Sequence, residues 1–451
     1  MPIGVRLPAP TLPPRTLALY GGPVVAAAYL LFFLQFYFLK FATDELLLAP
    51  AIVSTLFFAA KLWDGVSGPL IGSWSDRTRS RWGRRRPFLI GALPLLVSGF
   101  AMLWLVPHAL AGTALVAWIG IALFVFFTGF DLYTLPHMAL GAELSTDSHQ
   151  RTRLFAVRQM SFTAGILLAF AGIQVAMNAA DPRIAAAQLA VPAACVAALL
   201  LLVTPVAVRE PDRSGQSGGK GLVLAIRDVL ATSAARRLIF VNFIEAVGVG
   251  AVGTMAPFIA EYLLGQPEVV GLLPAAYVIA GVVAIPLWVR ISKSFGKRET
   301  WMFSMLLAAA AFSGIWFVGK GDVLLLMGLL VVAGAAMGCG GVLGNAILAD
   351  VIDLDERRTG ERKEGVYSAA LTLALKVGTA LAVGVSGPMM ALTGFAPNEV
   401  QTEQSLLGLR ILFAGMPCVG FLVGAWLFRG FSLDDQPPAP PASAIEVPSI
   451  P

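Results

Sequence analysis

The stretch from Trp63 to Phe88, WDGVSGPLIGSWSDRTRSRWGRRRPF, combines a charge within an apolar run and a cluster of charges just after it. Asp64 lies in the apolar run, and the loop that follows carries six arginines. An ionised carboxylate at the centre of a bilayer costs about 2.5–3.5 kcal/mol on insertion scales, so such a residue faces a cavity or a partner. Short loops rich in Lys and Arg stay on the cytoplasmic side. This stretch therefore predicts both a candidate site and the orientation of the chain.

The composition indicates a helical protein that crosses a membrane many times. Of the 451 residues, 57% are hydrophobic and only 13% are charged, about half of the charged share of a soluble domain. Several runs exceed 18 residues without a charge, which is long enough to cross a bilayer as a helix. The net charge of +5 does not indicate nucleic-acid binding, because the basic residues lie in short loops between apolar runs. There they set topology and contact the lipid bilayer.

Twelve transmembrane helices are predicted, in two six-helix bundles at 18–208 and 238–429. A polar linker at 209–237, expected in the cytoplasm, separates the bundles. The predicted spans are about 18–41, 49–72, 87–107, 112–138, 156–179, 186–208, 238–263, 268–290, 300–319, 322–349, 367–392 and 406–429.

The distribution of basic residues predicts that both termini are cytoplasmic. With that topology, 26 of the 32 Lys and Arg residues fall in cytoplasmic segments, whereas four fall in external loops or at span edges. This is the bias of the positive-inside rule. The tails at 1–17 and 430–451 then lie in the cytoplasm, and we expect the second to be disordered because it is rich in Pro and Ala.

A sequence echo links the two predicted bundles. SRWGRRRPF at 80–88 follows the second span, and SKSFGKRETW at 292–301 follows the eighth. Gly83 and Gly296 take the same place in the two segments, nearly half the chain apart. Transporters are often built from repeated helical halves, with the solute site near the midplane between them. The echo therefore favours a transporter over a channel or a membrane enzyme, and no catalytic or cofactor-binding pattern of residues is present.

Few ionisable residues lie deep in the predicted spans. Asp64 precedes Pro69 by five residues, and Asp131 precedes Pro136 by five. Both helices are expected to run from outside to inside, so the two carboxylates should lie at similar depth near the midplane. Lys376, about ten residues into its span, should reach a similar level from the other bundle. The other deep ionisable residues are Lys61, Arg158 and Glu245.

Two carboxylates and a lysine at one depth suit transport coupled to a cation. Carboxylate oxygens can bind Na⁺, or one carboxyl can carry a proton where burial and like charge favour its neutral form. We therefore expect the coupling cation, H⁺ or Na⁺, near Asp64 and Asp131, with Ser67 or Thr134 contributing. The alternative is a structural ion pair, for instance between Lys61 and Asp64 at i, i+3.

Three further residues are candidate substrate ligands. Lys376, in TLALKVGTALA, has no local counter-charge, so its partner is another helix or the substrate. Arg158 could contact substrate or extend to the cytosolic interface, and Glu245 is a third candidate. The aromatic residues of the first span, YLLFFLQFYFLKF, could stack on a sugar ring or pack in the bundle. The glycines of the tenth span, which let helices approach closely, are Gly328, Gly334, Gly338, Gly340, Gly341 and Gly344.

Three longer stretches carry a family resemblance: KLWDGVSGPLIGSWSDRTRSRWGRRRPF (61–88), LPHMALGAELSTDSHQRTRLFAVRQ (135–159) and ADVIDLDERRTGERKEGVYSAALTLALKVGTAL (349–381). Together they resemble the glycoside–pentoside–hexuronide:cation symporters of the major facilitator superfamily, typified by the melibiose carrier. The first motif is shared across the superfamily, whereas the third is more specific. The resemblance covers the chain apart from its tails.

This resemblance implies the major facilitator fold, alternating access, and a sugar carried with Na⁺, Li⁺ or H⁺. It places the family's helix-2 aspartate at Asp64, its helix-5 arginine at Arg158 and its helix-11 lysine at Lys376.

The chain also departs from the family pattern. The family's second carboxylate, four residues after the first, is replaced here by Gly68. In the fourth helix, Thr134 stands at the carboxylate position and Asp131 comes earlier. We expect Asp131 to take over part of the missing carboxylate's role.

We interpret the chain as a monomeric symporter of the cell inner membrane that carries a sugar or glycoside and uses no cofactor besides its coupling ion. Lys376 and Arg158 also suit an anionic substrate, such as a uronide or a lysophospholipid. A non-transporting assembly factor on the same scaffold is another alternative. The predicted cytoplasmic gate consists of Asp76, Arg77, Arg84, Arg85, Lys297, Arg298, Asp350 and Asp353.

Overall fold

The computed structural model of the chain describes residues 12–431, apart from 146, 209, 211–226, 228, 361 and 362. All regular secondary structure in these residues is helical. The predicted N-terminal tail up to residue 11, the C-terminal tail from residue 432 and much of the predicted linker lie outside the described residues. The disorder expected of the C-terminal tail therefore stays a prediction.

The helices up to α7 form the first half of the molecule. They are α1 (Pro14–Gly21), α2 (Val24–Asp44), α3 (Pro50–Arg77), α4 (Arg86–Trp104), α5 (Gly112–Glu143), α6 (Ser148–Met177) and α7 (Pro182–Ala207).

The helices from α9 onward form the second half. They are α9 (Ser233–Phe258) with the π-helix η1 (Ile259–Leu263), the 3₁₀-helix η2 (Pro267–Val269), α10 (Leu272–Phe295), α11 (Lys297–Ile315), α12 (Val323–Thr359), α13 (Glu364–Leu392), α14 (Glu403–Arg410), the π-helix η3 (Ile411–Gly415) and α15 (Met416–Phe428).

Ten helical segments of the described chain are long and apolar enough to cross a bilayer. Two of the longer helices, α3 and α11, are not among them. Lys61 and Asp64 lower the hydropathy of α3, and α11 begins with the charged run 297–299. With 28 and 19 residues, they are nevertheless about 42 and 28 Å long at 1.5 Å per residue, enough to cross a hydrocarbon core of about 30 Å. Their hydropathy, and not their length, is below that of the ten apolar segments.

The two halves repeat one packing scheme. In the first half, α2 packs against α6, α3 against α5, and α4 against α7. In the second half, α9 packs against α13, α10 against α12, and α11 against α15. The glycines of the sequence echo share a backbone conformation as well, with φ of 99° at Gly83 and 86° at Gly296. Glycine adopts such positive φ values at little cost.

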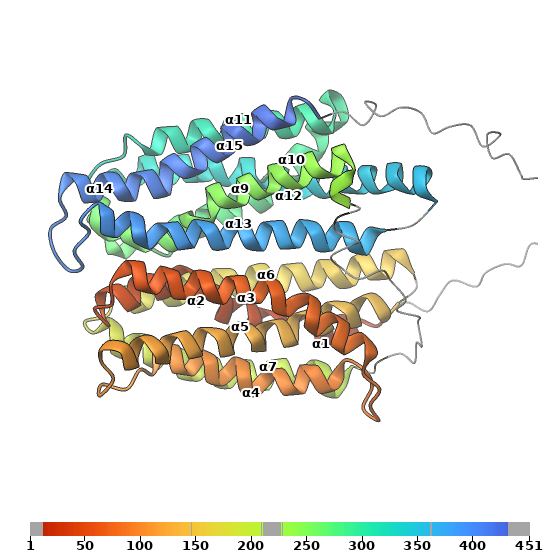
Figure 1. Cartoon of the computed structure of the whole chain (residues 1–451), viewed down its shortest axis with the longest axis horizontal. Helices are drawn as coiled ribbons and strands as arrows, with labels where there is room; N and C mark the ends of the chain where they lie inside the picture. The colour runs from red at the N-terminus through yellow and green to blue at the C-terminus, as the bar shows by residue number, and fades with distance from the viewer. Residues whose placement is uncertain are drawn as a thin grey trace, which may run out of the picture.

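The halves lie side by side as two layers of nearly parallel helices (Figure 1). At the seam between them, α13 packs along α3, and α2 packs against α9. Gly387 allows the close approach of α13 to α3, because a Cβ atom there would collide with the Pro50 carbonyl oxygen and with Ser54 Oγ. The close packing of α13 against α3 therefore requires a glycine at position 387.

Replacing Gly387 by Ala should destabilise the protein by about 1–3 kcal/mol, because the added methyl group overpacks the seam. Gly365→Ala, in the first turn of the same helix, is the matched control, since a Cβ there meets nothing within 4 Å. Melting temperatures of the two variants in detergent test this. A Gly387→Ala variant as stable as Gly365→Ala would contradict it.

Candidate functional site

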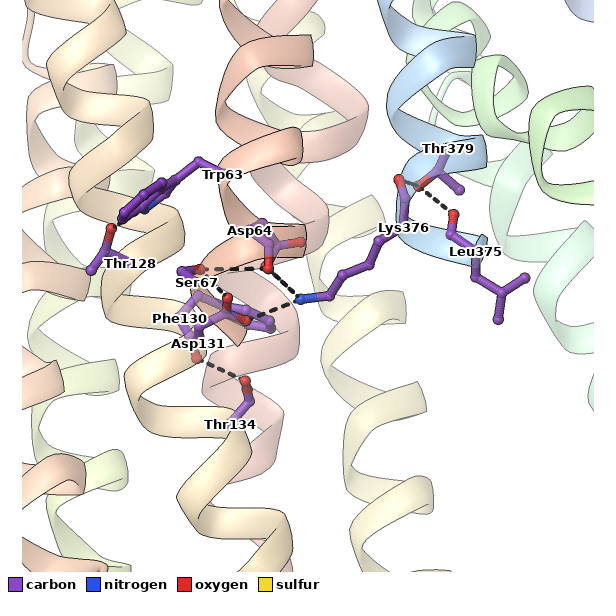
Figure 2. Close-up of polar contacts among 10 residues, drawn as sticks. All are labelled: Trp63, Asp64, Ser67, Thr128, Phe130, Asp131, Thr134, Leu375, Lys376 and Thr379. Carbon is purple, nitrogen blue, oxygen red and sulfur yellow. Dashed lines mark hydrogen bonds and ion pairs between the residues drawn. The ribbon is translucent and has the colours of Figure 1, made fainter. Parts of the chain in front are cut away.

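Lys376 of α13 reaches across the seam to two carboxylates of the first half (Figure 2). Its Nζ lies 2.8 Å from Asp64 Oδ1 on α3 and 3.2 Å from Asp131 Oδ1 on α5. It also donates a hydrogen bond of 3.0 Å to the backbone carbonyl of Asp64. The predicted similar depth of these residues thus corresponds to direct contact, and the cluster joins helices of both halves.

The two hydroxyl residues predicted for this site donate hydrogen bonds to different acceptors. Ser67 Oγ donates a 2.6 Å hydrogen bond to Asp131 Oδ2. Thr134 Oγ1 instead donates to the carbonyl oxygen of Phe130 in its own helix, at 2.8 Å. Ser67 is therefore part of the cluster as the structure describes it, whereas the Thr134 hydroxyl is directed to the backbone.

The carboxylates of the cluster are buried, whereas its lysine is partly exposed. Asp64 is 8% exposed and Asp131 is 2% exposed, whereas the Lys376 side chain is 27% exposed. Removing one partner of a buried ion pair typically costs about 3–5 kcal/mol, because it leaves an uncompensated charge. Lys376 therefore compensates the charges of both carboxylates, while part of its own side chain remains accessible.

Gly68 faces the same cluster. A Cβ atom at this position would lie 3.7 Å from Lys376 Nζ and 3.8 Å from Asp131 Oδ2. The space next to Gly68 is thus occupied by the lysine and by a carboxylate that enters from α5. Asp131 therefore brings a carboxylate close to Gly68, and its taking over part of the missing carboxylate's role stays a prediction.

Asp64 pairs with Lys376, and the structure shows no ion pair or hydrogen bond between Lys61 and any described residue. Lys61 Nζ lies 5.6 Å from the centre of the Phe127 ring. The side chain is buried yet borders a cavity between the two halves. The alternative hypothesis of a local Lys61–Asp64 pair is therefore not what the structure shows.

This central cavity has a volume of about 240 Å³ and lies between α2 and α3 of the first half and several helices of the second. Aromatic side chains of the first half form much of one wall, while Lys61 and Thr379 add polar groups. Thr379 follows Lys376 by one helical turn, which places the cavity beside the cluster. Lining residues used below are Phe32, Gln35, Phe36, Phe57, Lys61 and Thr379.

A second cavity, of about 440 Å³, lies within the second half between α9, α12 and α13. We call it the Glu245 cavity. Its polar lining residues are Asn242, Glu245, Asn345 and Thr379.

The three candidate substrate ligands occupy different places. Lys376 lies in the cluster and Glu245 borders its own cavity. Arg158 borders neither the central cavity nor the Glu245 cavity. Its backbone packs closely against Gly21, and its Nε is buried without a hydrogen-bond partner. The structure therefore does not bring Arg158 to the other two residues.

The arginine loop makes a compact network within the first half. Arg85 donates to Asp76 at 2.6 Å, to Glu143 at 2.9 Å and to Ser75 at 2.9 Å. Arg84 lies 3.1 Å from Glu143. Burial alone would lower the pKa of Arg85, but the hydrogen bond to Glu143 and the charge of Asp76 raise that pKa above its ordinary value. The network therefore fastens the loop to α3 and α5.

The echo of this loop pairs within the second half. Lys297 lies 2.6 Å from Asp350 on α12, and Arg298 donates to the backbone carbonyl of Arg429. The remaining predicted gate residues, Arg77 and Asp353, are exposed. All of these described ion pairs connect elements of one half. Within the described residues, the predicted gate residues form no ion pair between the two halves.

A second charged cluster between the halves was missed by sequence reasoning. Lys40 of α2 pairs with Asp44 and lies 2.7 Å from Glu261 of η1. Tyr262 donates to Asp44 at 2.6 Å, and Asn398 donates to the Asp44 carbonyl oxygen at 2.9 Å. In the sequence, the i, i+4 spacing of Lys40 and Asp44 could have indicated this cluster. In the described part of the chain, every ion pair between halves belongs to this cluster or to that of Lys376.

Comparisons with known proteins agree with this architecture. The family model described as MFS/sugar transport protein matches residues 19–435. The chain is 26% identical to an isoprimeverose transporter of Lactiplantibacillus pentosus, over 89% of this chain and 85% of that protein. It is also 26% identical to a putative sulfoquinovose importer of Salmonella typhimurium, over 88% of this chain and 84% of that protein.

Among solved structures, that of the nucleoside transporter NupG has a TM-score of 0.68 at 13% sequence identity. The match covers 92% of this chain and 99% of the NupG chain. This likeness shows the fold.

Lys376→Gln should lower the free energy of unfolding by about 3–5 kcal/mol, because it leaves two buried carboxylates without their cation. Adding Asp64→Asn should recover part of this loss, since one of those charges is then removed. Lys293→Gln, at an exposed lysine near the end of α10, is the control and should change little. Melting temperatures in detergent at neutral pH test the set. If the double variant is no more stable than Lys376→Gln alone, the ion-pair interpretation is wrong.

Proposed function

Since the chain belongs to the family of MFS/sugar transport proteins, we propose that it imports a sugar or glycoside together with a cation by alternating access. It is a membrane transporter and not an enzyme. We further propose that α3 and α11 cross the bilayer together with the ten apolar segments, that both termini are cytoplasmic, and that a monomer in the cell inner membrane carries out transport. The basic loop at 77–86 supports this orientation.

The observation that carries the proposal is the position of Lys376 Nζ between two carboxylates across the seam. Three oxygen atoms converge there: Asp64 Oδ1, the Asp64 carbonyl oxygen and Asp131 Oδ1. Carbonyl and carboxylate oxygens near the midplane are the ligands that transporters use for Na⁺ or H⁺. In the described chain no three His, Cys, Asp or Glu side chains form a metal-binding group. A sodium ion here would therefore need backbone or hydroxyl oxygens, such as that of Ser67.

In this mechanism, the coupling cation and the Lys376 ammonium compete for the same oxygens. Two positive charges a few Å apart repel strongly in a partly buried site. A cation bound to Asp64 and Asp131 therefore displaces the lysine and removes the charged contact between α13 and α3. The halves can then move relative to each other about the site, as in rigid-body alternating access.

We place the solute in the central cavity beside this cluster. Phe32, Phe36 and Phe57 provide apolar ring faces, and Gln35 and Thr379 provide hydrogen-bonding groups. Apolar faces with a few well-placed polar groups are typical of small-molecule sites. The relatives named for isoprimeverose and sulfoquinovose support a sugar as the solute.

Lys61 favours a second candidate, in which the transported sugar is anionic. Its ammonium borders the central cavity and has no ion pair with a described residue. The Phe127 ring gives the ammonium a cation–π contact but no counter-charge. A buried ammonium without a counter-charge is costly, and a carboxylate or sulfonate on the solute would compensate it. The relative named for sulfoquinovose, a sulfonated sugar, is consistent with this candidate.

Uptake by the purified protein in proteoliposomes tests the function. The panel comprises pentosides, hexosides, hexuronides, a sulfonated sugar and a lysophospholipid, each driven in turn by a sodium gradient and by a pH gradient. We expect at least one sugar to accumulate with one of the two gradients. Asp64→Asn and Asp131→Asn should each abolish gradient-driven accumulation, because each removes an oxygen ligand of the cation. Glu399→Gln, in an exposed loop, is the control. No accumulation of any sugar by the folded wild-type protein would contradict the proposal.

Lys61→Gln separates the two candidates. If the solute is anionic, this change should raise the KM for a hexuronide by about tenfold or more, the loss expected for a charge-assisted hydrogen bond. The KM for a matched neutral hexoside should stay within about twofold, because no ion pair is lost. Lys61→Arg, which keeps the charge, is the control. An equal effect on both sugars would mean that Lys61 acts on the coupling cluster and not on the solute.

A further inference from the structure

Glu245 of α9 is a buried carboxylate that the coupling cluster does not use. It is 8% exposed, and its Oε1 has no hydrogen-bond partner. No ion pair joins it to a Lys or Arg among the described residues. Burying a polar group without a partner costs several kcal/mol, and ionisable residues inside a membrane protein are by default functional candidates. Glu245 also lines a cavity, with its other oxygen, Oε2, on the side of Gly340 in the cavity wall, so a solute in that cavity is a candidate partner.

The polar lining of the Glu245 cavity includes hydrogen-bond acceptors on Asn242, Glu245 and Asn345. Asn242 Nδ2 donates to the Leu238 carbonyl oxygen at 2.9 Å, and Asn345 Nδ2 donates to the Gly341 carbonyl oxygen at 2.8 Å. Both amides are thus anchored to their own helices through the nitrogen. Their carbonyl oxygens are left to accept hydrogen bonds, as is the carboxylate. Such a wall binds a partner that donates several hydrogen bonds.

Much of the α12 side of the cavity, beside Asn345 and Met337, is bare backbone. Three glycines of α12 border the cavity at positions 340, 341 and 344. A Cβ atom at Gly340 would lie 3.1 Å from Trp301 Nε1 and 3.8 Å from Glu245 Oε2. A Cβ at Gly341 would meet nothing within 4 Å. The absence of side chains here keeps the cavity wide in front of the carboxylate.

The size and position of the Glu245 cavity indicate what kind of hydrogen-bond donor it can hold. The volume of about 440 Å³ lies within the range of small-molecule sites, about 300–1,000 Å³, and is far larger than a bare ion needs. The Glu245 cavity shares Val249, Gly250 and Thr379 with the central cavity. The two cavities are therefore adjacent.

We propose that the Glu245 cavity is a second subsite for the solute, which takes a sugar ring through its hydroxyl groups. The hydroxyls donate to Glu245 and to the amide oxygens of Asn242 and Asn345, and the ring lies against the glycine wall of α12. This inference rests on the proposed function and makes it more specific. The solute has two parts, of which one lies beside the coupling cluster and the other is held by the second half alone.

Filling the cavity with a side chain is the sharpest test. Gly341→Val adds an isopropyl group to the α12 lining of the Glu245 cavity. Gly328→Val is the matched control, because it places the same residue in the same helix at an exposed position with nothing within 4 Å of its Cβ. For a sugar accumulated by the wild type in the panel above, Gly341→Val should raise the KM by about tenfold or more, as expected for the loss of one or two hydrogen bonds. Gly328→Val should match the wild type.

Variants of Glu245 distinguish a subsite from a proton carrier. Glu245→Leu removes the acceptor and should raise the KM like Gly341→Val, while the dependence on the driving ion stays that of the wild type. Glu245→Gln keeps one acceptor and should have an intermediate KM. Melting temperatures and elution profiles identify any variant that fails to fold.

The outcomes separate the two proposals. If no sugar is accumulated by the wild type, the proposed function fails and the subsite fails with it. If the wild type accumulates a sugar and Gly341→Val has the KM of Gly328→Val, the subsite alone is wrong. If Glu245→Gln abolishes accumulation driven by a pH gradient without a change in KM, Glu245 carries a proton, and the subsite is again wrong.

Discussion

The ion pairs of Lys376 with Asp64 and Asp131 are the constraint on which the structure depends. Neither carboxylate can stay charged in the middle of the molecule without compensation, and the compensating charge comes from the other half of the chain. The seam between α3 and α13 is therefore both a packing surface and an electrostatic contact.

A similar arrangement recurs at one end of the molecule. There Lys40 lies between the carboxylates of Asp44 and Glu261, which belong to different halves. Lys376 therefore compensates two acids across the seam, whereas Lys40 compensates one acid of its own helix and one across the seam. The predicted gate residues of the basic loops pair within their own halves. The described contacts thus tie the halves together at the centre and at one end, as expected for one state of an alternating-access cycle.

The repeated fold carries an unequal distribution of charge. The two halves pair their helices in the same way, yet the cluster takes both carboxylates from the first half and the lysine from the second. The Glu245 cavity has its lining in the second half alone. One half therefore holds the carboxylates and the other holds the lysine that compensates them, so the charged cluster is complete only where the halves meet.

Hydrophobicity and charge in the sequence were sufficient to predict a helical membrane protein and the similar depth of Asp64, Asp131 and Lys376, and the resemblance of three sequence motifs indicated the family. A bilayer forces the backbone into helices, and the fixed rise per residue converts sequence position into depth. Rotation of each helix about its axis follows from packing, which no local pattern encodes. Only the tertiary structure could decide that Lys376 and not Lys61 pairs with Asp64, that Ser67 and not Thr134 contacts Asp131, and that Arg158 lies away from both cavities.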